Sequence, residues 1–393
     1  MDSDAGGDDM AIFRFMGGDY AWLAHFRNRM AGFVKIEGRL GPIMSASLHL
    51  FGRQLMESPS YHNPVSATVD GLLGLFRRHP PIGQLMPEDR LDGLTCLVTG
   101  ANSGLGLGTA RALAKRGARL ILACRSGIPQ TAEMLKRETG NQQIEMVALD
   151  LSDFAAIDRC CAELREKGVR LDRVILNAGI VPPKPLRTAQ GYEMMFGVHF
   201  LGNMRFILGL LRDGTIPNGV YANNRVAGQR PRIVFVSSES HRSGLPIDMA
   251  TLGQFVPYTT MGSIAHYGHS KLVMNAFARE LARRLSPGGT IQVAVHYLCP
   301  GPVNSNIARG APAWIKPLLG SVMSMLFVSP DKACAPVVYL TAARAIEDRT
   351  DIYLHLMSEK LPAAQACDPL LARQVWDAGL RMLQMDQNFQ PIN

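Results

Sequence analysis

The sequence predicts an α/β fold: a doubly wound parallel sheet with helices on both faces. From residue 91 onward, short runs of Val, Ile and Leu alternate with amphipathic segments, and a glycine-rich turn follows the first apolar run. Continuous apolar strands separated by helices are typical of a parallel sheet that is covered on both sides. Such sheets bind their ligands beyond the carboxyl ends of the strands.

The expected elements follow one another in a regular order. Strands are predicted at residues 95–100, 118–124, 144–150, 172–179, 231–238 and 291–298. Helices are predicted at residues 107–117, near 129–138, at 155–168 and at 272–285. We assign residues 91–345 to one nucleotide-binding domain and residues 346–393 to a C-terminal tail that packs on its core.

Residues 1–90 differ in texture from the rest of the chain. Short helix-like pieces are broken by Gly and Pro, and in one of them, 65–78, the apolar side chains share one helical face. The sequence HPPIG at 79–83 is expected to be a linker. We therefore expect an N-terminal helical extension of the domain.

The composition excludes several classes of protein. The chain has 393 residues, of which 47% are hydrophobic and 19% charged, so a wholly disordered chain is excluded. The net charge of +8 comes without a Lys/Arg-rich run, and we expect no nucleic-acid partner. Seven cysteines without a CxxC pair predict neither a metal site nor a disulfide framework.

Apolar runs in the sequence are shorter than the roughly 20 residues that a membrane-spanning helix needs. The acidic start of the chain is unlike a secretory signal. We therefore expect a cytoplasmic protein. Peripheral contact with a membrane, through the N-terminal helices or the apolar segment 311–330, stays open.

The turn between the first strand and the first helix is rich in glycine. Glycines here permit a tight turn and a close approach of the backbone to a pyrophosphate, which the N-terminus of the next helix stabilises. The candidate cofactor-binding residues are Thr99, Gly100, Asn102, Ser103, Gly104, Leu105 and Gly106. Arg125 follows the second strand, where an acidic residue suits a ribose diol and a basic one a 2′-phosphate. This predicts NADP(H) rather than NAD(H).

Tyr267 and Lys271 are four residues apart at the start of a predicted helix, so their side chains share one face. A neighbouring ammonium favours a phenolate, and Lys271 is therefore expected to lower the pKa of Tyr267. Ser238, at the end of the fifth strand, points a hydroxyl toward the ligand crevice, where it can hold a carbonyl oxygen. A strand-ending serine cluster and a chance Tyr–Lys pair are the alternative interpretations.

In this order, the motifs resemble those of the short-chain dehydrogenase/reductase family, whose domain is of the Rossmann type. The resemblance implies that Ser238, Tyr267 and Lys271 are catalytic, and that Tyr267 and Lys271 also contact the cofactor. It adds further cofactor contacts at Asp150, Leu151, Asn177, Ala178, Gly179, Pro300, Gly301 and Val303. The sequences ANSGLG, ACRS and SSESHRSG are similar to the retinol-dehydrogenase-like branch. Protochlorophyllide reductases share some of this pattern.

One position departs from the family's pattern. His199 stands where the family usually has an Asn that anchors a water in the proton relay. An imidazole also donates and accepts hydrogen bonds, and it titrates near neutrality. We therefore place His199 among the catalytic residues, with either an altered relay or a reduced activity as the consequence.

The motifs and the resemblance together predict an NADP(H)-dependent oxidoreductase. It would transfer hydride between the nicotinamide and a small lipophilic alcohol or carbonyl compound, such as a retinoid, a steroid or a polyketide-like molecule. The segment 311–330, in the place of the family's substrate-covering lid, favours an apolar substrate; a core-packing helix is its alternative interpretation.

Two other functions stay open at this stage. One is the reduction of a carbon–carbon double bond, which uses the same cofactor geometry. The other is an NADPH-binding scaffold or sensor without turnover, which only His199 favours. By analogy with the family alone, two chains would pair as a homodimer through the helix that carries Tyr267 and its neighbouring helix.

Overall fold

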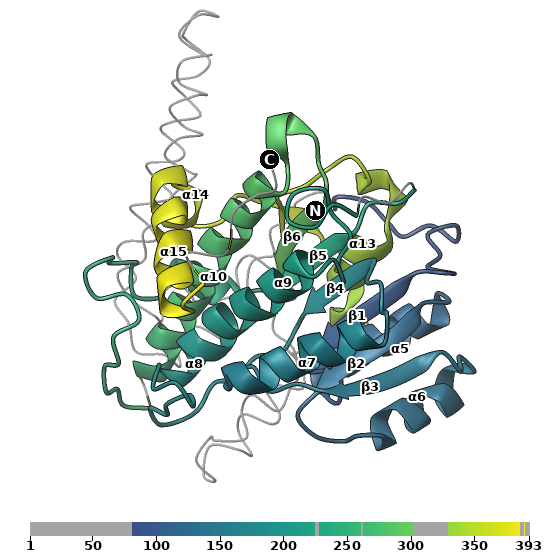
Figure 1. The fold of residues 1–393 in the computed structure, drawn as a ribbon, viewed down its shortest axis with the longest axis horizontal. Helices are drawn as coiled ribbons and strands as arrows, with labels where there is room; N and C mark the ends of the chain where they lie inside the picture. The colour runs from purple at the N-terminus through teal and green to yellow at the C-terminus, as the bar shows by residue number, and fades with distance from the viewer. Residues whose placement is uncertain (1–80, 225–227, 261, 302–328, 386–388, 390–393) are drawn as a thin grey trace, which may run out of the picture. The chain divides into compact units, whose positions relative to one another are not determined.

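The computed structural model describes residues 81–224, 228–260, 262–301, 329–385 and 389, which all belong to the compact unit Ser60–Asn393. They form one sheet in the strand order β3-β2-β1-β4-β5-β6-β7-β8 (Figure 1). Neighbouring strands from β3 to β7 pair in parallel, and β8 pairs antiparallel with β7. The predicted doubly wound α/β fold is confirmed.

The six predicted strands are all present, and five of them lie inside their predicted ranges. The strands are β1 (Thr95–Thr99), β2 (Arg119–Cys124), β3 (Ile144–Ala148), β4 (Arg173–Leu176), β5 (Arg232–Val236), β6 (Ala294–Cys299), β7 (Ile352–His355) and β8 (Ser358–Glu359). The sheet thus continues past residue 345, where we expected the domain to end. The four residues of β7 are too few for an apolar pattern to distinguish a strand from a loop.

Helices connect the strands and cover the sheet. Those before β5 are α5 (Gly104–Lys115), α6 (Gln130–Thr139), α7 (Phe154–Glu166), α8 (Met194–Phe196), the π-helix η2 (Gly197–Gly202) and α9 (Asn203–Arg212). The α-helices after β5 are α10 (Gly262–Arg284), α12 (Pro330–Ala333), α13 (Ala335–Ala342), α14 (Ala364–Cys367) and α15 (Pro369–Met382). The short 3₁₀ turns after β5 are η3 (Glu239–Arg242), η4 (Pro287–Gly289) and η6 (Arg344–Ile346).

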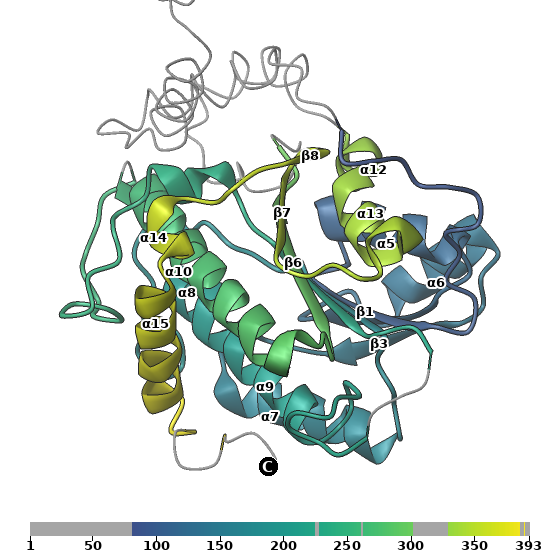
Figure 2. The same ribbon diagram turned by 90° about the horizontal axis from the view of Figure 1, so that it is seen from above.

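The helices lie on both faces of the sheet (Figure 2). On one side, α5, α6 and α13 pack on the sheet; on the other side, α7, α9 and α10 do so. Alternate side chains of one strand therefore enter two different cores: Val295 and Tyr297 of β6 belong to one cluster and Leu298 to the other. Because every parallel crossover returns to the same edge, the motif residues that follow the strands gather at the carboxyl ends.

The helix α15 forms an additional layer outside α10. Asp368 caps its start, since its side chain accepts hydrogen bonds from the N–H groups of Leu370 and Leu371, and Pro369 occupies the first helical turn. Trp376 is fully buried and stacks on Phe277 of α10, with ring centroids 5.6 Å apart. The guanidinium of Arg284 lies 4.4 Å from the Trp376 ring. A homodimer that paired through this face of α10 would have to displace α15.

One helical stretch among the described residues is long and apolar enough to span a membrane. It runs over Met194–Arg212, with a mean hydropathy of 1.4, and 83% of it is buried inside the protein. It comprises α8, η2 and α9, whose side chains belong to the core between the sheet and α10. Burial in the core accounts for its apolar composition.

The packing of Trp376 predicts a large effect on stability. Replacing it in Trp376→Ala removes a fully buried ring and leaves a cavity between α10 and α15, so the free energy of unfolding should fall by about 3–5 kcal/mol. Leu370→Ala, on the same helix but 63% exposed, should change it by less than about 0.5 kcal/mol. Urea denaturation of the two variants measures both values, and equal losses would contradict this packing.

Candidate active site

The glycine-rich turn joins the end of β1 to the start of α5. Gly100 has a φ of +65° and Gly104 a φ of +52°, conformations that glycine adopts without strain. A Cβ on Gly106 would lie 2.3 Å from the Gly100 carbonyl oxygen and 2.4 Å from Nδ2 of Asn177. Only glycine therefore lets the first turn of α5 come this close to the loop.

The start of α5 suits a pyrophosphate. Its N-cap residue, Ser103, is exposed and makes no side-chain cap hydrogen bond among the described residues. The first N–H groups of the helix thus point out of its end without a side-chain partner, and helix N-termini of this kind bind anions. Leu105 is buried beneath the turn and anchors it to the core.

Thr99 and Asn177 hold the carboxyl ends of β1 and β4 together. The Thr99 hydroxyl oxygen accepts hydrogen bonds from the N–H groups of Asn177, at 3.0 Å, and Ala178, at 2.9 Å. In return, Nδ2 of Asn177 donates to the carbonyl oxygens of Thr99, at 3.0 Å, and Gly100, at 3.3 Å. These bonds fix the glycine-rich turn to the loop after β4.

The loops after β2 and β3 complete the cofactor side. Nδ2 of Asn102 donates to the carbonyl oxygen of Ser126 at 3.1 Å, so the glycine-rich turn is tied to the loop that carries the exposed Arg125. Asp150 accepts from the N–H and the hydroxyl of Ser152, at 2.9 and 2.6 Å, which orders the loop after β3. The Leu151 side chain is buried in the hydrophobic core.

Tyr267 and Lys271 lie on α10 as predicted, with Nζ of Lys271 5.8 Å from the centroid of the Tyr267 ring. Burial, aided by Cys299, raises the pKa of Tyr267 to about 12, and only Ser238 opposes that rise. Burial also lowers the pKa of Lys271 to about 7, and its Nζ donates to the carbonyl oxygen of Val236 at 2.8 Å. The expectation that Lys271 lowers the pKa of Tyr267 is therefore wrong for this geometry, and Tyr267 is a neutral phenol.

His199 forms a bridge between two elements. Its Nδ1 lies 2.8 Å from the Ser270 hydroxyl, which itself donates to the carbonyl oxygen of Tyr267 at 2.7 Å. Its Nε2 accepts from the N–H of Ile180 at 3.0 Å. These partners assign the proton to Nδ1, and they occupy both ring nitrogens.

Burial, aided by the nearby charge of Lys271, holds the pKa of His199 well below its usual value. The expectation that His199 titrates near neutrality is therefore wrong. The fully buried ring is a fixed neutral link between the loop after β4 and the catalytic helix. Nδ2 of Asn203 donates to the His199 carbonyl oxygen at 2.9 Å, inside the segment where η2 widens the helix.

The loop after β6 begins at Pro300. Gly301 has a φ of +79°, and a Cβ there would lie 2.5 Å from the Leu356 side chain, so the turn needs glycine. Its N–H donates to the sulfur of Cys299 at 3.4 Å. Val303 and almost all of the apolar segment 311–330 lie outside the described residues, as do residues 1–80, to which the prediction of N-terminal helices applies.

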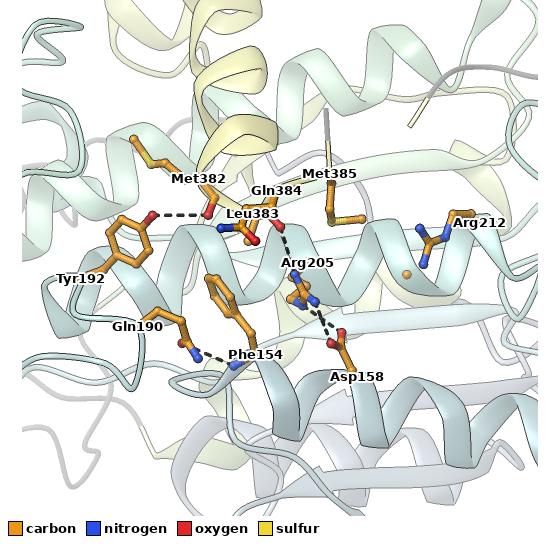
Figure 3. A pocket seen from close by; sticks show the side chains of 11 residues that line it. Phe154, Asp158, Gln190, Tyr192, Arg205, Arg212, Met382, Leu383, Gln384 and Met385 are labelled. Carbon is orange, nitrogen blue, oxygen red and sulfur yellow. Dashed lines mark hydrogen bonds and ion pairs between the residues drawn. The ribbon is translucent and has the colours of Figure 1, made fainter. Parts of the chain in front are cut away.

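A pocket of about 560 Å³ opens elsewhere on the molecule, between α7, α9 and the end of α15 (Figure 3). Arg205 pairs there with Asp158 at 2.6 Å and donates to the carbonyl oxygen of Leu383 at 3.2 Å. The Tyr192 hydroxyl donates to the carbonyl oxygen of Met382 at 3.3 Å. These contacts attach the end of α15 to the helical layer, and none of the motif residues lines this pocket.

A family model described as short chain dehydrogenase matches residues 94–316. The chain is a short-chain dehydrogenase/reductase. It is 32% identical over 335 residues to retinol dehydrogenase 13 of Homo sapiens. This match covers 83% of this chain and 96% of that protein. It is 31% identical over 317 residues to polyprenol dehydrogenase of Mus musculus, covering 79% and 88% of the two chains. The resemblance to the retinol-dehydrogenase-like branch is confirmed.

Solved structures agree with this assignment. An uncharacterised protein of Mycobacterium paratuberculosis matches 75% of this chain and 95% of its own, with a TM-score of 0.56 and 26% identity. The Pseudomonas aeruginosa RhlG/NADP active-site complex matches 69% and 98%, with a TM-score of 0.50 and 23% identity, which shows the fold alone. As a short-chain dehydrogenase/reductase, the chain is an oxidoreductase that uses a nicotinamide cofactor and acts on alcohols.

Sequence reasoning found the motif residues of this dehydrogenase but missed the partners that hold them. Ser270 and Ile180 fix the His199 ring, and the carbonyl oxygen of Val236 holds Lys271. Ser270 lies inside the Tyr267–Lys271 motif, three residues after Tyr267. That spacing on the helix was the signal in the sequence that Ser270 lies near the catalytic residues. Backbone partners such as Ile180 leave no trace in the residue types.

The bridge predicts how His199 responds to pH. Unfolded chains protonate His near pH 6.5, whereas the folded chain keeps His199 neutral, so its contribution to stability is present above about that pH and is lost as the pH falls. In ¹H–¹⁵N spectra of the imidazoles, assigned with His199→Gln, we expect the Nδ1–H tautomer from about pH 8 down to about pH 5. A titration midpoint near neutrality would exclude the fixed bridge.

Proposed function

We propose that the chain transfers hydride reversibly between NADP(H) and a lipophilic alcohol or the corresponding carbonyl compound. The observation that carries this proposal is the hydrogen bond from Nζ of Lys271, on the same helix as Tyr267, to the carbonyl oxygen of Val236, two residues before Ser238. A phenol and a hydroxyl so placed hold a substrate oxygen from two sides. When bound, the nicotinamide supplies or accepts the hydride.

The residues of the cofactor side fit a phosphorylated dinucleotide. The N-terminus of α5 offers its N–H groups to the pyrophosphate across the Gly100–Gly106 turn. Arg125, exposed after β2, offers a positive charge at the place where a ribose-binding acid would stand. Asn102 ties these two loops together. This charge supports NADP(H) over NAD(H) as the cofactor.

In the direction of reduction, Tyr267 is the proton donor. Burial keeps its hydroxyl protonated at neutral pH, because its pKa is raised to about 12. A carbonyl oxygen that gains the electron pair of its double bond becomes an alkoxide, a much stronger base than a phenolate. The proton therefore passes from Tyr267 to this oxygen, and water returns a proton to Tyr267 afterwards.

Lys271 and Ser238 assist that transfer in different ways. Ser238 opposes the rise of the Tyr267 pKa, so it favours the phenolate that the transfer leaves. Lys271, whose pKa is lowered to about 7, gains its full charge when an anionic or polar partner offsets its burial. We assign it to the nicotinamide ribose, on the same helical face as Tyr267.

Two observations support an apolar substrate. Relatives that cover most of the chain are named for retinol and for polyprenol, which are long apolar alcohols. The sequence between the loop after β6 and α12 also carries the apolar segment 311–330. A retinoid or isoprenoid carbonyl compound is therefore the first substrate to test.

The bridging role of His199 supports an enzyme over a scaffold without turnover. A neutral imidazole that links the loop after β4 to α10 keeps the catalytic helix in register, although it differs from the family's usual Asn. His199 is the only residue of the sequence that favours a non-catalytic scaffold. Turnover by the wild-type protein decides between the two functions.

Tyr267→Phe should abolish turnover while leaving the fold intact. Removing the hydroxyl takes away the proton donor, so kcat should fall by about 10³-fold, while the dissociation constant of NADPH changes by less than about a factor of 3. The consumption of NADPH with a retinoid aldehyde, followed by absorbance, measures the rate.

A matched control is Tyr221→Phe. The Tyr221 ring packs at a tilt against Phe389, with centroids 4.4 Å apart, and its hydroxyl is buried near Arg284. We expect this variant to retain wild-type kcat. Full turnover in Tyr267→Phe would refute the mechanism, and absence of turnover from the wild-type protein with all aldehydes, ketones and enones tested would refute the function.

A further inference from the structure

Ser238 is held in place by contacts that its own strand does not make. Its carbonyl oxygen accepts hydrogen bonds from the N–H of His241, at 3.1 Å, and from Nδ1 of the same residue, at 2.6 Å. The His241 ring is 1% exposed, and its Nε2 accepts from the N–H of Ala363 at 3.0 Å. One imidazole thus joins the Ser238 backbone to a segment 122 residues after His241.

The protonation state of His241 suits both of these contacts. Burial, reinforced by the charge of Arg242, lowers the pKa of His241 to about 4. A neutral imidazole with its proton on Nδ1 donates through that nitrogen and accepts through Nε2. Because each nitrogen has one partner, the ring holds one orientation.

Glu239 makes a second link from the same turn. The Tyr353 hydroxyl of β7 donates to Oε1 at 2.5 Å, and Nε of Arg242 donates to Oε2 at 3.0 Å. Burial alone would raise the pKa of Glu239. The charge of Arg242, with smaller contributions from His355, His241 and the hydrogen bond from Tyr353, outweighs burial and brings the pKa to about 2. Arg242 also donates to the carbonyl oxygen of Leu361.

These links attach the whole turn η3 to the C-terminal part of the chain. A largely buried carboxylate costs free energy unless it is paired, and an apolar side chain of similar size often stabilises a fold as well. The network is therefore poorly explained by stability alone. What it does accomplish is to fix both ends of the turn that begins at Ser238.

We propose that Tyr353, His241 and Arg242 are positioning residues for Ser238. Through them, β7 and the segment 361–363 fix the Ser238 hydroxyl beside Tyr267. The role in catalysis rests on the proposed function, in which Ser238 and Tyr267 hold the substrate oxygen. The C-terminal part of the chain then acts on the reaction through Ser238.

A pair of neighbouring tyrosines provides a matched test. Tyr297 of β6 lies beside Tyr353 in register, with ring centroids 5.3 Å apart, and its hydroxyl donates to Asp351 at 3.1 Å. Tyr353→Phe and Tyr297→Phe each delete one partly buried hydrogen bond to a carboxylate. The partner of Tyr353, Glu239, belongs to the turn that begins at Ser238, whereas the partner of Tyr297, Asp351, does not. The two variants therefore release different loops.

Amide hydrogen exchange of peptides that cover residues 237–243 is the first measurement. We expect exchange to be about tenfold faster in Tyr353→Phe and unchanged in Tyr297→Phe, because only the former loosens the turn. Should Tyr353→Phe fail to fold, Arg242→Gln releases the same turn from its more exposed side, and the same acceleration is expected. Equal exchange in a folded release variant and in Tyr297→Phe would overturn the proposal.

Steady-state kinetics with NADPH and a retinoid aldehyde is the second measurement. We expect Tyr353→Phe to lower kcat about tenfold with the KM for NADPH unchanged, and Tyr297→Phe to stay within about twofold of wild type. A loosened turn without any loss of kcat would overturn the positioning role while leaving the proposed function intact. A loosened turn in a protein whose wild type has no turnover would refute the proposed function, while the structural link to Ser238 would stand.

Discussion

The site depends on a reciprocal set of hydrogen bonds between Thr99 and Asn177. Each side chain satisfies backbone groups of the other strand end, at the point where the strand order of the sheet reverses. The chain of contacts continues from the loop after β4 through His199 and Ser270 to the helix that carries Tyr267. The glycine-rich turn, the central loop and the catalytic helix thus hold one another in fixed positions.

Burial sets the protonation states throughout this region. It keeps His199 neutral, raises the pKa of Tyr267 and lowers that of Lys271. The catalytic side is therefore assembled largely from neutral hydrogen-bonding groups, which lose little hydration free energy when an apolar substrate excludes water. The exceptions are Lys271, which is partly charged at neutral pH because its pKa is about 7, and Glu239, which is paired with Arg242. The charge of Glu239 lies in the network that holds Ser238, next to the reacting groups.

Local patterns were enough to predict the framework but not the contacts that complete it. The apolar strands, the glycine-rich turn and the Tyr267–Lys271 spacing are short-range signals, and they gave the fold and the motif residues. The His199 bridge depends on Ser270, 71 residues away, and the Glu239–Tyr353 bond spans 114 residues. No periodicity encodes such pairs. The sign of the pKa shift of Tyr267 also required its burial, which spacing alone does not determine.

The affinity for NADPH of Gly106→Ala tests the account most directly. The added Cβ would lie 2.3 Å from the Gly100 carbonyl oxygen, so the turn must move away from the start of α5. Calorimetric titration should show that wild type binds NADPH more tightly than NADH, and that the variant binds both roughly tenfold or more weakly while remaining folded. Unchanged affinity in a folded Gly106→Ala protein would contradict a cofactor site at this turn.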